Sequence, residues 1–179
     1  GSNQPALIGR METNTAGNDW SFGALTTGAV SFFYYNPGNT TLYNVTTTQL
    51  MSTGTWNHIA VSVDVSTNPP TIRVFLNGQI SGSSAQIQNY AGMTIATQPL
   101  MLIGQFNKLP INAYVTNLRI VQGAALYTAN FTPPAAPLQV ATSGATQLLV
   151  RVPRTQGKVQ MQKAIGSSSN NPSGVGAFP

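Results

Sequence analysis

The sequence predicts an all-β protein, a two-sheet antiparallel β-sandwich followed by an extended C-terminal tail. Short apolar or alternating segments recur along the chain, separated by turn-forming residues, as in sandwich domains. β-branched and aromatic residues are frequent in these segments, and no segment shows a convincing helical pattern. We therefore expect residues 1–152 to form one sandwich domain and residues 153–179 to form the tail, which is basic at first and then rich in Gly, Ser, Asn and Pro.

The expected strands follow one another at short intervals. Residues 20–25 and 29–35 flank the sequence Thr26-Thr27-Gly28, which is typical of a hairpin loop. The sequence Asn36-Pro37-Gly38-Asn39 predicts a turn before the next extended segment. The full set of expected strands comprises residues 6–11, 20–25, 29–35, 41–47, 57–65, 72–77, 100–106, 114–121 and 146–152.

Residues 57–65 show the clearest strand pattern. The aliphatic residues Ile59, Val61 and Val63 alternate with polar or small residues that include His58 and Asp64. Side chains on a strand change face with period two, so this pattern predicts a half-buried strand with its aliphatic face inward.

A second strand and a tight turn follow closely. Residues 72–77 are predicted to be extended, while Pro69 and Pro70 before them cannot donate to a strand ladder. Asn77-Gly78 supplies the positive φ angles that a two-residue hairpin turn requires. We therefore expect a hairpin that turns at Asn77-Gly78.

Two motifs resemble a known family. Residues 54–61 (GTWNHIAV) and 72–78 (IRVFLNG) resemble the signature segments of laminin-G-like, concanavalin A-type jelly-roll domains, in which G-x-W-x-H-I-A-V precedes I-x-V-Y-V-N-G. Residues 115–134 (VTNLRIVQGAALYTANFTPP) resemble a stretch of the laminin-G-like domains of bacteriophage and other large-virus proteins. The resemblance spans about residues 20–150, and it implies a concanavalin A-like jelly roll.

The resemblance also suggests that a strand is missing. Members of the family usually begin with an amphipathic strand before the residues that match the start of this chain. Either the chain is a fragment, or another chain or segment supplies this strand. An unpaired sheet edge favours association, so one expectation is that a neighbouring chain donates a strand at the edge near Ala6 to Arg10. The tail, residues 153–179, is the second expected contact with partner proteins.

The charge content is low. Only 6% of the residues are Asp, Glu, Lys or Arg, against about 25% in an average soluble domain. This composition fits a protein whose faces are covered by neighbouring subunits, or one that works outside a cell. The net charge is +5, but the eight basic residues are either near the C-terminus or scattered, which argues against a nucleic-acid partner.

Several classes of site are excluded. The chain has no cysteine, so disulfides, zinc-thiolate sites and thiol catalysis are ruled out. No apolar run approaches the ~18 residues that span a bilayer, so we expect no membrane partner.

We expect no enzymatic activity. Glycosidases of the jelly-roll type use two carboxyl groups, whereas this chain has three acidic residues in all and only one glutamate: Glu12, Asp19 and Asp64. His58 matches the structural histidine of the family signature, so a role on the strand face is preferred to a catalytic triad.

Ligand sites are expected to be weak. Laminin-G-like domains often hold calcium near one rim, but Asp19 and Asp64 would each bring a single carboxylate, so they are only weak calcium candidates. The densest cluster of sugar-binding residue types is Tyr34, Asn36, Tyr43 and Asn44, although aromatic residues on strands are commonly buried. Trp20 and Trp56 are expected to pack in the core or at its rim.

The function expected from these features is that of a non-enzymatic structural component of a virus or phage particle. A minor capsid, decoration, fibre or tail protein would assemble with other virion proteins or with copies of itself, and it would be located in the virion. The alternative is a carbohydrate-binding adhesion module, extracellular or at a cell surface, that recognises host or matrix glycans.

Overall fold

The computed structural model describes residues 7–10, 20–35, 42–82, 85–87, 101–102, 113–151 and 160–162. The chain divides into two compact units, which are described separately. The larger unit comprises residues 1–114 and 125–135, and the smaller one residues 115–124 and 136–179. Every strand pairing among the described residues is antiparallel, and these residues contain no helix. The predicted all-β antiparallel fold is confirmed.

The first sheet of the larger unit has the strand order β4-β3-β2-β1-β9. The predicted strand at residues 29–35 is found with the same bounds, whereas the expected strand 41–47 runs on to Leu50. The strands are β1 (Ile8–Arg10), β2 (Trp20–Ala24), β3 (Ala29–Tyr35), β4 (Leu42–Leu50) and β9 (Met101–Leu102).

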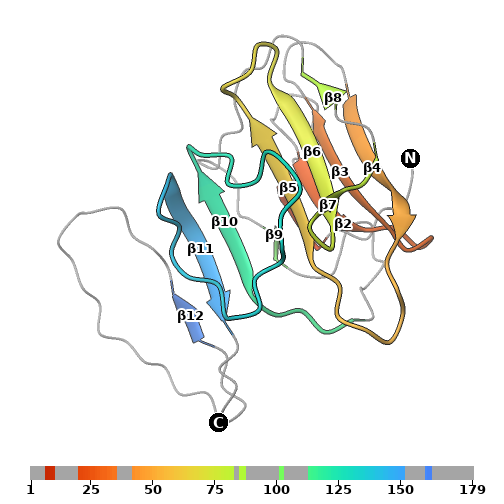
Figure 1. The fold of residues 1–179 in the computed structure, drawn as a ribbon, viewed down its shortest axis with the longest axis vertical. Coiled ribbons are helices and arrows are strands. Elements are labelled where there is room, and N and C mark those ends of the chain that lie inside the picture. The colour runs from red at the N-terminus through yellow and green to blue at the C-terminus, as the bar shows by residue number, and fades with distance from the viewer. Residues whose placement is uncertain are drawn as a thin grey trace, which may run out of the picture. The chain divides into compact units, whose positions relative to one another are not determined.

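The second sheet of the larger unit has the order β5-β6-β7, and β8 also pairs with β6. Figure 1 shows β5 and β6 in front of the first sheet, with β6 in front of β3, and both β3 and β4 contact β6. The strands are β5 (Ile59–Asp64), β6 (Thr71–Leu76), β7 (Gln79–Ile80) and β8 (Ala85–Gln86).

Large apolar side chains fill the core of the larger unit. In the register of the first sheet, Trp20 pairs with Tyr34 and Phe22 with Phe32, so these aromatic residues share one face. All four are buried, and Trp20 contacts Phe32 with ring centroids 6.4 Å apart. In the second sheet the buried residues of β6 include Ile72, Val74 and Leu76.

Burial on β5 does not follow the predicted alternation: the aliphatic residues Ile59, Val61 and Val63 are only half-buried. Ser62 and Asp64 lie on the polar face of β5, and both are buried. Phe75 on β6 pairs with Ala60 and is therefore on the same face, and it too is buried. The prediction that the aliphatic face is the buried one is therefore wrong on β5, because an alternating pattern does not reveal which segments of the fold cover the polar face.

The edge beside β1 is occupied at two residues. Ile8 pairs with Phe22 on β2 and with Leu102 on β9, and Gly9 pairs with Ser21 and Met101. The free edge expected near Ala6 to Arg10 is therefore closed at Ile8 and Gly9 by a strand of the same chain. A strand donated by a neighbour cannot pair at these two positions in this arrangement, and Ala6 lies outside the described residues.

The smaller unit contains one three-stranded sheet in the order β10-β11-β12. A register shift between Ile120 and Val121 interrupts the pairing of β10 with β11. The strands are β10 (Leu118–Gln122), β11 (Ala145–Arg151) and β12 (Gln160–Gln162). The last of these lies in the predicted tail, so residues 160–162 are extended and paired, while residues 152–159 and 163–179 lie outside the described part.

Candidate functional site

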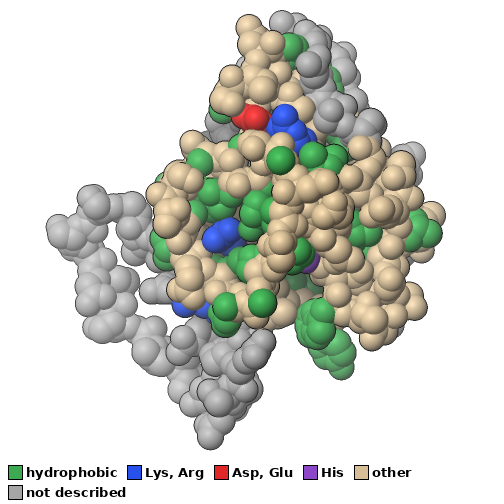
Figure 2. Space-filling view, viewed as in Figure 1, with side chains coloured by type: hydrophobic (Ala, Val, Ile, Leu, Met, Phe, Trp, Pro, Cys, Tyr) green, Lys and Arg blue, Asp and Glu red, His purple; other side chains and the backbone are tan. Residues whose placement is uncertain are grey.

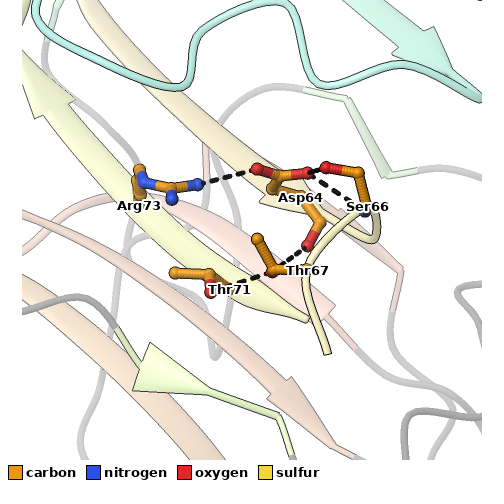
Figure 3. Close-up of polar contacts among 5 residues, drawn as sticks. All are labelled: Asp64, Ser66, Thr67, Thr71 and Arg73. Carbon is orange, nitrogen blue, oxygen red and sulfur yellow. Dashed lines mark hydrogen bonds and ion pairs between the residues drawn. The ribbon is translucent and has the colours of Figure 1, made fainter. Parts of the chain in front are cut away.

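Asp64, at the end of β5, is held in a network of polar contacts (Figure 3). Its Oδ1 atom accepts hydrogen bonds from the Ser66 hydroxyl at 2.6 Å and from the Ser66 backbone N–H at 3.1 Å. Its Oδ2 atom forms an ion pair with the Arg73 guanidinium at 3.2 Å. The Thr67 hydroxyl donates to the Asp64 carbonyl oxygen at 3.0 Å and lies 3.1 Å from the Thr71 hydroxyl.

These contacts keep Asp64 ionised. The hydrogen bond from the Ser66 hydroxyl lowers the pKa of the carboxyl group, burial acts in the opposite direction, and the Ser66 N–H and Arg73 lower it further. Both carboxylate oxygens are engaged, so calcium binding at Asp64 would require the Arg73 ion pair to open. The geometry thus fits a structural anion rather than a calcium ligand or a general base.

The described residues around this carboxylate offer no metal site. Within the part of the chain that the structure describes, no three His, Cys, Asp or Glu residues lie close enough to hold a metal ion. Asp19, the other calcium candidate, lies outside the described residues, as does Glu12.

His58 lies in an aromatic cluster. Its imidazole meets Phe131 and Tyr127 edge-on, with centroid distances of 5.4 Å and 6.5 Å. The rings of Tyr127 and Phe131 stack with their centroids 3.7 Å apart, and Phe75 contacts both of them. Edge-to-face contacts of this kind stabilise packing. His58, just before β5, therefore belongs to an aromatic cluster that packs against Phe75 of β6.

The predicted hairpin at Asn77-Gly78 is confirmed. Asn77 and Gly78 have φ angles of 52° and 78°, and Leu76 pairs with Gln79 across the turn. The Asn77 side chain also accepts a hydrogen bond from the His58 backbone N–H at 2.8 Å, and the Asn77 N–H donates to the His58 carbonyl at 2.7 Å. Asn77 thus connects the turn between β6 and β7 to the start of β5.

The second motif packs directly on this turn. The Phe131 N–H donates to the Gly78 carbonyl at 2.8 Å, and the Asn130 side chain accepts from the Ile80 N–H at 2.8 Å. A Cβ atom at Gly78 would overlap the Phe131 carbonyl oxygen and would lie 2.8 Å from Pro133 Cδ. The two motifs therefore form one interlocked structure, which explains their sequence pattern without a ligand.

The predicted sugar-binding cluster is not assembled on one surface. Tyr34 is fully buried and its ring stacks near that of Tyr43, 6.4 Å away, so the expected contact of Tyr34 with a sugar is wrong. Asn44 follows Tyr43 on β4 and therefore projects from the opposite face, where it accepts a hydrogen bond from Ser31 at 2.9 Å. Asn36 lies outside the described residues.

An exposed tryptophan was missed by the sequence reasoning. Trp20 is buried as expected, but 69% of Trp56 is exposed. Trp56 lies in the loop between β4 and β5, and the next residue, Asn57, bonds back across this loop. An exposed loop position was signalled only by the neighbouring Gly54 and the Thr and Ser residues around it, which favour turns.

The comparison with protein families matches the chain over residues 1–127 to the concanavalin A-like lectin/glucanases superfamily, in its laminin-G-type form. The chain belongs to this superfamily. The match includes the signature hairpin and reaches Tyr127 of the second motif. No curated protein and no solved structure matches the chain significantly.

Membership of the superfamily accounts for the fold of this chain but not for an activity, because the description of the superfamily covers both lectins and glucanases. In this member the histidine and aspartate of the signature strand are engaged in packing and in an ion pair. Among the described residues, the exposed aromatic side chains of Trp56 and Tyr114 are features with the character of a binding surface.

Proposed function

We propose that this protein is a non-enzymatic structural component of a virus or phage particle, such as a minor capsid, decoration, fibre or tail protein. In this role it acts through assembly with other virion proteins or with copies of itself. The viral assignment relies on the similarity of residues 115–134 to laminin-G-like proteins of phages and large viruses.

The observation that carries the proposal is an almost uncharged surface on which large apolar side chains are exposed. Charged residues make up 6% of the chain, and Figure 2 shows few of them on the face in view. Contacts between proteins favour aromatic and aliphatic anchors and disfavour charged residues at their centre. The exposed large hydrophobic residues of the described part are Leu50, Trp56, Val65, Ile80, Tyr114 and Val140.

The shortage of acidic groups supports a non-enzymatic role. Canonical glycoside hydrolysis needs a pair of carboxyl groups, and the chain has one glutamate and two aspartates. Asp64 is already paired with Arg73 and bonded to Ser66. A glucanase mechanism would have to rely on Glu12 and Asp19 alone.

A carbohydrate-binding adhesion module is the second candidate, favoured by the exposed ring of Trp56 and by the lectins in the superfamily description. Aromatic rings of this kind can stack on the apolar face of a sugar. In that case a glycan array should show binding by the wild type, and Trp56→Ala should abolish it. The matched control is Val65→Ala, which truncates another exposed apolar residue.

The proposal is tested by quantitative mass spectrometry of virus particles purified from a sample that carries the gene. We expect peptides of this protein at a fixed ratio to the major particle proteins across gradient fractions. Peptides that stay outside the particle fractions, or purified protein that releases sugars from polysaccharides, would contradict the proposal.

A further inference from the structure

Asn77-Gly78 is the one Asn-Gly pair in the sequence, and every other asparagine is followed by a residue that carries a side chain. In an unfolded chain, the backbone nitrogen that follows an asparagine can attack the side-chain amide, and a glycine at that position hinders the attack least, because it has no Cβ. Asn77 is exposed, while Gly78 is buried. By local sequence, Asn77 is therefore the asparagine most prone to deamidation.

This reaction needs no reagent other than water. The Gly78 nitrogen, after losing its proton, forms a bond to Asn77 Cγ, and the bond from Cγ to Nδ2 breaks as ammonia leaves with a proton in place of the one lost. The product is a five-membered cyclic imide. Water then opens the ring at either carbonyl, giving aspartate or isoaspartate. In isoaspartate the main chain runs through the side-chain carbon.

The folded conformation of Asn77 opposes ring closure. The Gly78 nitrogen has to eclipse Asn77 Cβ about the Cα–C bond before the ring can form. The φ angles of 52° and 78° at Asn77 and Gly78, in a two-residue hairpin, are those of a type I′ turn. In this turn the first residue has a ψ angle of about 30°, which places the following nitrogen nearly opposite Cβ. The attacking nitrogen is thus turned away from the amide.

Hydrogen bonds to His58 hold both parts of Asn77 in place. The Asn77 N–H donates to the His58 carbonyl at 2.7 Å, and the Asn77 Oδ1 atom accepts from the His58 N–H at 2.8 Å. Swinging the side chain toward the Gly78 nitrogen breaks the second of these bonds. The alternative movement, a rotation of Gly78 toward the side chain, displaces the Gly78 carbonyl.

The second motif prevents this rotation of Gly78. The Phe131 N–H donates to the Gly78 carbonyl at 2.8 Å. Beside it, the Asn130 side chain accepts from the Ile80 N–H at 2.8 Å. The Phe131 backbone lies so near that a Cβ atom at Gly78 would overlap its carbonyl oxygen. Gly78 therefore cannot turn until residues 130–133 move away.

We propose that Asn77 is a deamidation site that the fold keeps closed and that opens when residues 130–133 leave the turn. The reaction then proceeds from the opened population alone, as other chemistry gated by local unfolding does. Isoaspartate adds one carbon atom to the main chain, which a two-residue turn cannot accommodate in the pairing of Leu76 with Gln79. Deamidation thus marks irreversibly each chain in which the turn has opened. The inference goes beyond the proposed function and does not rely on it.

The test follows the modified fraction of Asn77 by peptide mapping and mass spectrometry during incubation of the full chain at mildly alkaline pH. Two wild-type samples are compared, one folded and one unfolded in guanidinium chloride. Modification should be at least about tenfold slower in the folded sample, because opening has to precede the reaction. In the unfolded sample, Asn77 should be modified before the other asparagines.

Two variants test the role of the second motif under folding conditions. Asn130→Ala removes the hydrogen bond to the Ile80 N–H, and Phe131→Ala removes the stacked ring. Asn130→Ala should speed the modification of Asn77 by about threefold or more, as expected for the loss of one hydrogen bond. The matched control, Val65→Ala, truncates an exposed residue in a different turn and should leave the rate unchanged. Circular dichroism checks the fold, and Asn130→Ala alone decides if Phe131→Ala does not fold.

Four outcomes overturn the inference. They are equal rates in the folded and unfolded wild type, a wild-type rate in Asn130→Ala, an equal acceleration in Val65→Ala, and isoaspartate-containing chains that refold with wild-type stability after removal of guanidinium chloride.

Discussion

Single substitutions in the ion pair between Arg73 and Asp64 should lower the stability of the fold. The Arg73 side chain is partly exposed, while Asp64 is buried. Arg73→Met should therefore leave a buried carboxylate without its counter-charge, lowering the free energy of unfolding by about 1–2 kcal/mol in urea denaturation at neutral pH. Asp64→Asn combined with Arg73→Met should cost less than the sum of the two single changes. Strict additivity would show that the pair contributes no coupling.

The same carboxylate should give the protein an acid-sensitive component of stability. The pKa of Asp64 in the folded state lies below the ordinary value of 3.8. A group with a lowered folded pKa stabilises the fold above its unfolded pKa, and this contribution is lost as the pH falls through 3.8 to the lower folded value. Between about pH 6 and pH 3, the unfolding free energy should fall less in Asp64→Asn than in the wild type.

The small number of acidic residues makes this comparison of pH profiles easy to interpret. Besides Asp64, only Glu12 and Asp19 titrate as acidic side chains, and both remain in the Asp64→Asn variant. The difference between the two pH profiles therefore reports on Asp64 alone. Identical profiles would mean that Asp64 has the same pKa in the folded and unfolded states.

At the scale of elements, the turn between β6 and β7 is a position where glycine is required. Gly78 combines a φ angle of 78° with close contacts to Phe131 and Pro133, whereas Gly54 has a φ angle of 72° and no neighbouring atom within 4 Å of a built Cβ. Gly78→Ala should lower the free energy of unfolding by about 3 kcal/mol or more, because backbone strain and steric overlap add. Gly54→Ala should cost about 1 kcal/mol, from strain alone.

Chemical denaturation of Gly78→Ala and Gly54→Ala separates the cost of backbone strain from the cost of steric overlap. The difference between them measures the overlap with the segment that carries Phe131. Equal losses of stability in Gly78→Ala and Gly54→Ala would show that this segment moves away at little cost, which would contradict the interlocked arrangement of the two motifs.

Most strands of this fold could be predicted from local patterns, because alternation and turn residues are local signals. The strand at 29–35 and the turn at Asn77-Gly78 are the clearest examples, since both depend on residues adjacent in sequence. The short strands β7, β8 and β12 were not predicted. Elements of two or three residues carry too little periodicity to be recognised, and their pairing depends on neighbours supplied by the fold.

The candidate site was harder to predict than the strands. Tyr43 and Asn44 are consecutive on a strand, so alternation alone already separates them onto opposite faces. The burial of Tyr34 could not be read from the sequence, because alternation along a strand does not say which face is covered. The exposure of Trp56 was indicated only by the turn-forming residues that precede it. Whether such a side chain is covered depends on segments that are distant in the chain.

At the scale of the whole molecule, the net charge of +5 and the low content of acidic residues should govern how association responds to salt. Two copies repel each other over several ångströms at low ionic strength, and salt screens this repulsion while leaving an uncharged contact intact. Sedimentation at increasing sodium chloride should therefore show tighter self-association. An acidic or nucleic-acid partner would give the reverse trend, with binding weakened by salt.

The described residues include no helix long and apolar enough to cross a membrane. The larger unit combines the sheets β4-β3-β2-β1-β9 and β5-β6-β7 around an aromatic core, and this unit contains both the exposed Trp56 and the turn at Asn77-Gly78.

The contact of Gly78 with Phe131 has a consequence for how this sequence can change over time. The hydrogen bond from Ile80 to Asn130 joins positions 50 residues apart in the chain. Any side chain at Gly78 would have to be accommodated by a shift of the segment around Phe131. Substitutions at Gly78 and at residues 130–131 should therefore occur together. Related sequences that lack the glycine at position 78 should also differ at Asn130 and Phe131.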